Sequence, residues 1–123
     1  MIDIITNNPR ILSLYPAATW IAGHPIDVLY ESRRRVQEGY PLLTHPLMGD
    51  IHLLTNPYRT AILGDKKTEE VDTVSLQWVE AIIEKILSVA PKPRGVEDLD
   101  DYQIIDVELV QAVMKSDGVI NNP

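Results

Sequence analysis

The sequence predicts one α/β domain, residues 1–123, in which a small and mainly parallel sheet of about four strands is flanked by helices. Two observations predict this fold class. Short apolar runs that end at proline-containing turns alternate with longer segments of helical periodicity, which is typical of layered α/β folds. The length of 123 residues is also in the common range for one domain with one core.

The N-terminal part contains two predicted strands. Residues 2–6, IDIIT, and residues 19–23, TWIAG, are β-branched or aromatic runs that end at Asn-Asn-Pro and Gly-His-Pro. These residue types are enriched in strands, and the turn residues mark the strand ends. The segment 9–17 between them has room only for a short helical turn, because Pro16 limits it.

Residues 25–38 have the periodicity of a crossover helix. Pro25 suits the first helical position, and Gly39 suits a left-handed cap at the end. Within this helix the three arginines at 33–35 cover nearly a full turn. At least one of them is therefore expected to lean toward the border of the core, on an otherwise solvated face.

Two further strands are predicted at 40–45, YPLLTH, and 58–64, YRTAILG. Residues 51–54, IHLL, are either an extra strand or part of a loop. The connection 46–57 has no helical pattern and is long for a compact domain, and such loops are usually functional or mobile. The residues expected to be mainly buried on adjacent strands are Ile4, Ile5, Trp20, Ile21, Leu42, Leu43, Ile62 and Leu63.

The C-terminal part contains two predicted helices. The first covers 74–90, with Asp72 or Thr73 as its N-cap, and the second covers about 101–116 after a Pro/Gly and acid-rich connection at 91–100. The second helix has two neighbouring apolar stripes, made of Ile105, Leu109 and Val113, and of Val107, Val110 and Met114. This apolar surface is wider than one contact needs, so we expect the helix also to border an interface, most simply of a homodimer.

Composition and charge exclude several classes. The net charge is −7, the whole excess of acids falls in residues 65–123, and there is no basic stripe of the kind that nucleic-acid binding needs. With no cysteine, the chain has no disulfide, thiolate metal site or cysteine nucleophile. No apolar run is long enough to cross a membrane and no secretory signal is visible, so a cytoplasmic protein is expected.

Four prolines follow asparagine or histidine, at Asn8-Pro9, His24-Pro25, His45-Pro46 and Asn56-Pro57. A residue before proline is pushed toward an extended conformation, so each pair places a polar side chain where an extended segment ends. In a parallel sheet such ends share the carboxyl edge, where open α/β sheets bind ligands. The residues predicted to bind a ligand there are Thr6, Asn7, Asn8, Thr44, His45, Gly49, Asn56, Tyr58 and Arg59.

Each of these residues also has a structural interpretation. Asparagine and histidine before proline serve as helix caps and turn starters. His45 is the candidate general acid or base, because imidazole titrates near neutral pH, but it is also interpretable as a structural histidine. Arg59 suits a carboxylate or phosphate ligand, or a surface ion pair. No cofactor is predicted, since GxGxxG, GxxxxGK[ST] and GxSxG are absent, and no metal is predicted.

Three segments resemble a known family. TNNP at 6–9, LLTHPLMG at 42–49 and NPYRT at 56–60 are similar to the GrdX family, small proteins associated with the glycine, sarcosine and betaine reductase systems of anaerobic bacteria. Arg59 stands where the family pattern has lysine, so the positive charge is kept. The resemblance implies a setting beside a selenoprotein and thioredoxin-dependent reductase, where a protein without cysteine suits an accessory role.

Two functions follow from these residues. The first is an accessory or regulatory module that binds a small carboxylate or phosphate ligand, or a loop of a partner such as a reductase-complex subunit. The second is a small acid/base enzyme that uses His45, with Arg59 as an anion clamp. The first is favoured, because pairs of titratable groups with shifted pKa values, the usual sign of acid/base machinery, are not evident at the predicted strand ends.

Overall fold

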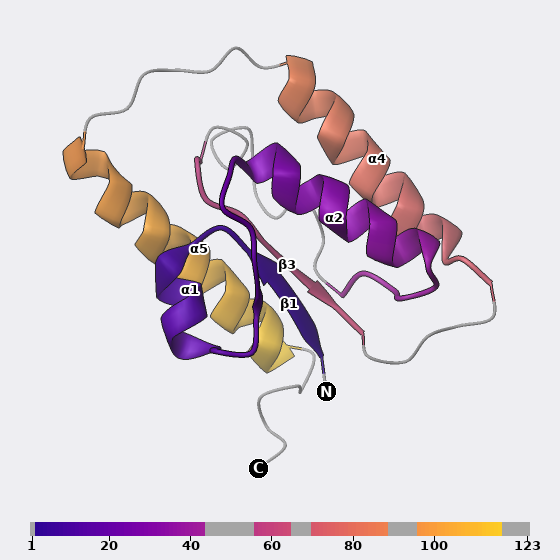
Figure 1. Ribbon diagram of the computed structural model, residues 1–123, viewed down its shortest axis with the longest axis horizontal. Helices are drawn as coiled ribbons and strands as arrows, with labels where there is room; N and C mark the ends of the chain where they lie inside the picture. Colours follow the sequence, from indigo (N-terminus) through magenta and orange to yellow (C-terminus); the bar gives the residue numbers. More distant parts are fainter. Residues whose placement is uncertain (1, 44–55, 65–69, 89–95, 117–123) are drawn as a thin grey trace.

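In the computed structural model, residues 2–43, 56–64, 70–88 and 96–116 are described, and they form three layers (Figure 1). The middle layer is a small sheet. Helices α2 and α4 pack on one face of it, and helices α1 and α5 lie on the other. The predicted α/β class with helices on a small sheet is therefore confirmed.

The sheet has the strand order β2-β1-β3. Its strands are β1 (Asp3–Thr6), β2 (Thr19–Trp20) and β3 (Thr60–Leu63). The central strand β1 pairs in parallel with β2 and antiparallel with β3, in a register that places Thr6 opposite Thr60. The end of β1 and the beginning of β3 therefore lie at the same edge of the sheet.

The prediction of about four mainly parallel strands is not confirmed. In the described ranges the sheet has three strands, and Leu42 forms only an isolated antiparallel bridge with Leu63. Parallel pairing needs a crossover, usually a helix, and the sequence between residues 43 and 60 has no helical periodicity. The possible strand 51–54 and the end of the predicted strand 40–45 lie outside the described residues.

The two N-terminal helices lie in the segments where the sequence predicts helical structure. Helix α1 (Pro9–Leu14) is capped by Asn8, whose side chain accepts a hydrogen bond from the Arg10 amide at 3.0 Å. Helix α2 (Pro25–Gln37) is followed by Gly39, which has a φ of 112°. Glycine adopts this left-handed conformation without a steric cost, so the predicted cap is confirmed.

The two C-terminal helices differ in how well their starts were predicted. Helix α4 (Thr73–Ser88) begins after Asp72, whose carboxylate accepts from the Val74 amide at 3.2 Å, which confirms the predicted cap. Helix α5 (Val96–Ser116) begins before the predicted start near residue 101. Part of the connection predicted at 91–100 is therefore helical.

Each face of the sheet has its own apolar cluster. The cluster under α2 and α4 consists of Ile5, Val28, Leu29, Val36, Leu42, Ala61, Leu63, Val79, Ile82 and Ile83. The cluster under α1 and α5 consists of Ile4, Ile11, Ile62, Val110 and Met114. The prediction that Trp20 is buried is wrong, because it lies on a two-residue edge strand and is 42% exposed. In the described ranges, no helix has the length and apolar character needed to cross a membrane.

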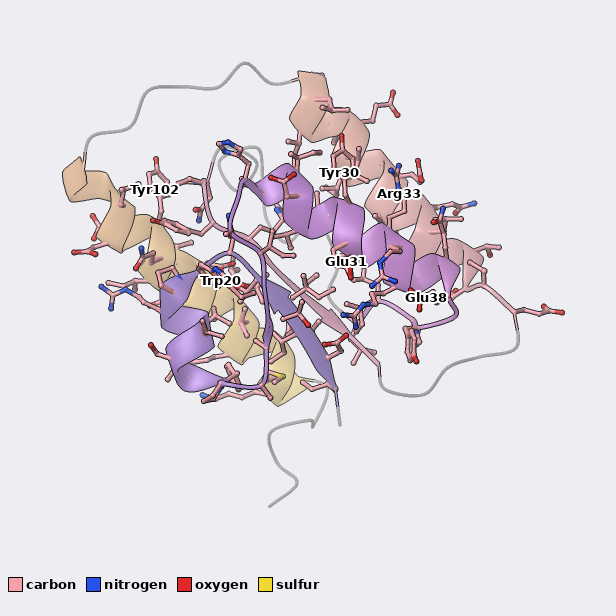
Figure 2. All side chains as sticks on the ribbon, viewed as in Figure 1. Trp20, Tyr30, Glu31, Arg33, Glu38 and Tyr102 are labelled. Atoms are coloured by element: carbon pink, nitrogen blue, oxygen red, sulfur yellow. The ribbon has the colours of Figure 1, made fainter. Side chains whose placement is uncertain are left out.

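The outer face of α2 is charged, and Figure 2 labels Glu31, Arg33 and Glu38 on this helix. The three arginines at 33–35 divide as predicted. Arg35 leans toward the sheet and forms ion pairs with Asp3 and Glu31. Arg33 lies over the Tyr30 ring, 5.2 Å from its centroid, on the outside of the helix. The arginine run is therefore used in ion pairs and surface contacts, as the expected solvated face implies.

Candidate functional site

A group of polar side chains gathers where β1 ends and β3 begins, beside α5. This sheet-end cluster consists of Thr6, Asn7, Asn8, Asn56, Tyr58, Arg59, Thr60 and Asp106. The antiparallel pairing of β1 and β3 creates it, because the residues that follow β1 then lie beside those that precede β3. This pairing brings together six of the predicted ligand-binding residues: Thr6, Asn7, Asn8, Asn56, Tyr58 and Arg59.

Asn7 joins two loops at this edge. Its side-chain amide donates to the carbonyl oxygens of Gly23, at 3.0 Å, and Pro57, at 2.9 Å. Its side-chain oxygen accepts from the Arg59 amide at 2.8 Å, and the Asn7 amide donates to the Arg59 carbonyl at 3.4 Å. Asn7 therefore holds the backbone of Arg59 from two sides.

Asn8 connects the end of β1 to both helices on that face. Its side-chain oxygen caps α1, while its Nδ2 donates to the Gln103 carbonyl and to Asp106 Oδ2, both at 3.0 Å. The residue is fully buried. All these bonds depend on an amide that donates and accepts at once, which explains the asparagine at this position.

Two threonine hydroxyls form a chain of hydrogen bonds that ends on Asp106. The Asn8 amide donates to Thr6 Oγ1 at 3.0 Å, and the Thr6 and Thr60 hydroxyl oxygens are 2.8 Å apart. Thr60 donates to Asp106 Oδ2 at 2.7 Å, so the proton between the two threonines belongs to Thr6. The direction of every bond in this chain therefore favours a carboxylate at its end.

Asn56 provides a second connection to α5. Its side-chain oxygen accepts from the Tyr58 amide at 2.8 Å, and its Nδ2 donates to the Tyr102 carbonyl at 3.1 Å. Figure 2 labels Tyr102 on α5. The bond to Tyr58 makes the local turn that an asparagine before proline favours, so the structural interpretation applies to this side chain.

One pair of opposite charges belongs to the cluster. Burial raises the pKa of Asp106, and hydrogen bonds from Asn8 and Thr60 together with the charge of Arg59 oppose that rise. Burial likewise lowers the pKa of Arg59, and the charge of Asp106 opposes this. Each ion offsets part of the cost of burying the other. Chemically, an amide, a hydroxyl and a guanidinium together form a receptor for a carboxylate.

The remaining predicted site residues, Thr44, His45 and Gly49, lie outside the described residues. The prediction that the shared edge arises from parallel strands is corrected by the antiparallel pairing of β1 with β3. Sequence reasoning missed Asp106. Its signal is a lone acid four and eight residues before Val110 and Met114, on the face of α5 that packs on the sheet. Among the described residues, no group of three or more histidines, aspartates or glutamates is arranged to hold a metal.

The fold and the cluster define a class: a small layered α/β protein in which buried polar side chains at a sheet end hold a C-terminal helix. The chain belongs to the GrdX family, since the family model described as GrdX-like protein matches residues 3–115. The match extends from β1 into the last turn of α5 and includes every residue of the sheet-end cluster. No curated protein and no solved structure matches the chain.

Proposed function

We propose that this protein is an accessory or regulatory protein of the glycine, sarcosine and betaine reductase systems. It binds a carboxylate or phosphate group at the sheet-end cluster, carried by a small ligand or by a loop of a reductase subunit. The observation that carries this proposal is the surroundings of Asp106, whose carboxylate accepts from an amide and a hydroxyl and is favoured by the charge of Arg59. The same chemistry suits an anion from outside the chain.

The residues of the cluster divide into a scaffold and a contact surface. Thr6, Asn7, Asn8 and Asn56 are buried and bonded within the protein, so they position their neighbours. Tyr58 and Arg59 are only partly buried. Because the Arg59 backbone is held by Asn7, its side chain is a positioned cation, and it is the residue we assign to contact with the anion.

A small acid/base enzyme is the second candidate. It is favoured by the raised pKa of Asp106, since general acids work best when their pKa approaches the working pH. In this alternative His45 is the acid or base and Arg59 the anion clamp. We favour the binding module because the Asp106 carboxylate is engaged by Asn8 and Thr60 inside the protein.

Calorimetric titration with acetate, glycine, betaine, acetyl phosphate and inorganic phosphate tests the proposal. Arg59→Gln is expected to weaken binding of the anion that binds best by about ten- to a hundredfold, the usual effect of losing a charge-assisted hydrogen bond. Arg33→Gln, on the outer face of α2, is the matched control and should bind normally. Equal binding by the two variants, or no binding of any anion by the wild type, would refute the proposal.

Two additions make this experiment decisive. Arg59→Lys keeps the charge, so it should fold and retain more binding than Arg59→Gln even if the latter is destabilised. Thermal unfolding of each variant separates loss of binding from loss of structure. Following the bound anion by NMR then distinguishes the candidates: an unchanged anion supports the binding module, and turnover that is lost in His45→Ala supports the enzyme.

A further inference from the structure

Asp106 of α5 is a buried carboxylate inside the sheet-end cluster. It is 5% exposed, and its Oδ2 accepts from Asn8 Nδ2 at 3.0 Å and from Thr60 Oγ1 at 2.7 Å. Thr60 directly follows Arg59 in the chain, and the Asn7 side chain holds the Arg59 amide at 2.8 Å. The carboxylate and the backbone of the cation are therefore held by the same hydrogen-bonded network.

The charged groups around Asp106 act on it unequally. The titratable groups with described side chains on the elements packed around it are Asp3 of β1, Arg10 and Tyr15 at α1, Tyr58 and Arg59 before β3, and Asp100, Asp101, Tyr102, Glu108 and Lys115 of α5. Arg10 lies 3.4 Å from Asp100, and Asp3 is at the opposite end of β1 from the cluster. Among these groups, the charge of Arg59 is the one that favours the ionised form of Asp106, against the burial that disfavours it. The ionisation of Asp106 therefore depends on the charge of Arg59.

An anion at Arg59 changes this balance, because it brings a negative charge to the cation that favours the carboxylate. We infer that anion binding at the sheet-end cluster is coupled to the uptake of a proton by Asp106. This inference rests on the proposed function and adds its regulation by pH. Both hydrogen bonds to the carboxylate within the described residues go to Oδ2, so Oδ1 is the oxygen that takes the proton. The cluster then gains an anion and a proton together, and its net charge does not change.

The coupling determines how anion binding depends on pH. A second negative charge raises the pKa of Asp106 further, so this pKa is lower in the free protein than in the complex. Between the two pKa values, Asp106 is ionised before the anion binds and neutral afterwards. The affinity for the anion therefore falls as pH rises through this window and is constant on either side of it. A difference of one between the two pKa values corresponds to about a tenfold change in affinity.

NMR titration of the Asp106 side-chain carboxyl carbon in the full chain tests the coupling directly. The wild type is titrated alone and with saturating formate, which stays ionised above about pH 5 because simple carboxyl groups titrate near pH 4. Formate is expected to move the midpoint of the Asp106 titration to higher pH. An unchanged midpoint in the presence of bound formate would overturn the inference.

Calorimetric titration with formate from about pH 5 to about pH 8 measures the consequence for binding. The affinity of the wild type is expected to fall by about tenfold as pH rises. Asp106→Asn keeps a side-chain oxygen that accepts from Asn8 and Thr60 but takes up no proton. It should therefore bind formate about tenfold more tightly than the wild type at about pH 8, with no dependence on pH. Asp101→Asn, the matched change at an exposed position of α5, should behave as the wild type does.

The outcomes separate this inference from the proposed function. Formate binding that is independent of pH in the wild type, or equally pH-dependent in Asp106→Asn, would overturn the inference and leave the anion site in place. The second of these results would assign the proton to another group, such as His24 or His45. Failure of both proteins to bind formate would also overturn the inference, whereas the proposed function is refuted only if the other anions fail to bind as well. Thermal unfolding shows whether each variant is folded, and the NMR titration of the wild type decides the question if Asp106→Asn is not.

Discussion

The two faces of the sheet are held to their helices in different ways. Under α2 and α4 the contact is mainly an apolar cluster, to which Ser75 adds a polar link between α4 and the segment before β3: its Oγ accepts from the Leu42 amide at 2.9 Å and donates to the cap residue Asp72 at 2.7 Å. Under α1 and α5 the apolar cluster is smaller, and a buried polar network connects Asn8, Thr60 and Asp106 across elements.

Because of this difference, the α2/α4 face mainly stabilises the fold, and the α1/α5 face mainly determines where α5 lies. Apolar contact is non-directional and tolerates changes of shape, so the α2/α4 face holds its helices without fixing each atom. Hydrogen bonds are directional, so Asn8 and Asn56, which bond to carbonyls of α5, set where that helix lies along the sheet. Asn8 and Thr60 also donate to Asp106, which lies in the sheet-end cluster. The polar face is therefore also the one that carries the proposed function.

The largest loss of stability is expected from Asp106→Ala, which tests whether the polar network is what holds α5 to the sheet. Removing the carboxylate takes away the acceptor of the Thr60 hydroxyl and one acceptor of the Asn8 amide, and it removes the opposite charge that favours the Arg59 cation. Breaking a buried pair in this way typically costs about 3–5 kcal/mol. Urea unfolding at neutral pH measures it. Asp101→Ala, an exposed acid of the same helix, should change stability by less than about 0.5 kcal/mol; a similar cost for both would contradict the role given to Asp106.

Ile82→Ala probes the opposite face and should cost about 2–5 kcal/mol, the range for truncating a buried isoleucine. Ile82 is fully buried in the α2/α4 cluster. Its loss should leave anion binding unchanged, because it removes apolar contact on the face of the sheet opposite α5. Urea unfolding and calorimetry on the same variant check both expectations. A variant that stays folded but no longer binds the anion would show that the two faces are coupled.

Much of the fold could be predicted from local sequence signals. The caps at Asn8, Gly39 and Asp72 and the periodicity of α2 and α4 are encoded in short stretches, and the structure agrees with them. Strand direction is different, because it depends on how distant segments meet. The lack of a helical pattern between residues 43 and 60 was the available sign that Leu42 would meet β3 in antiparallel direction.

The candidate site was predicted in part for a reason that was wrong. Thr6, Asn7 and Asn8 do meet Tyr58 and Arg59, but through antiparallel pairing, and the asparagines turn inward to bond within the protein. The fourth partner of the network, Asp106, comes from α5. A contact about a hundred residues away along the chain leaves no local motif, and only its place on the packed stripe of α5 pointed to it.

The pH dependence of stability is a smaller effect that sharpens the same comparison. Burial raises the pKa of Asp106 in the folded protein above its unfolded value of about 4. The folded state then binds more protons in the window between the two pKa values, so this carboxyl favours folding at acid pH, and that contribution is lost as pH rises through the folded pKa.

Asp106→Asn removes the titration, so the stability of the wild type relative to Asp106→Asn should fall from about pH 4 toward neutral. Urea unfolding of both proteins across this range measures it, and a constant or rising difference would contradict the raised pKa. Ile82→Ala should show no such trend relative to the wild type.

The smallest effect is expected at the outer surface, where α2 and α4 are joined by charge. Arg33 Nη1 lies 3.4 Å from Glu80 Oε1, and the two side chains are 34% and 51% exposed. Water and salt weaken such a pair, and holding two long side chains together costs entropy, so a coupling free energy of about 0.2–1 kcal/mol is expected. A double-mutant cycle with Arg33→Gln, Glu80→Gln and the double variant isolates it. The cycle is needed because Arg33 also lies over the Tyr30 ring, a contact that Glu80→Gln leaves in place.

The coupling free energy between Arg33 and Glu80 should shrink when sodium chloride is added, whereas the loss of stability in Asp106→Ala should persist, since buried charges are screened far less than exposed ones. A coupling above about 2 kcal/mol that does not respond to salt would show that the position of α2 against α4 depends strongly on a charge pair, and the distinction between the two faces would no longer hold.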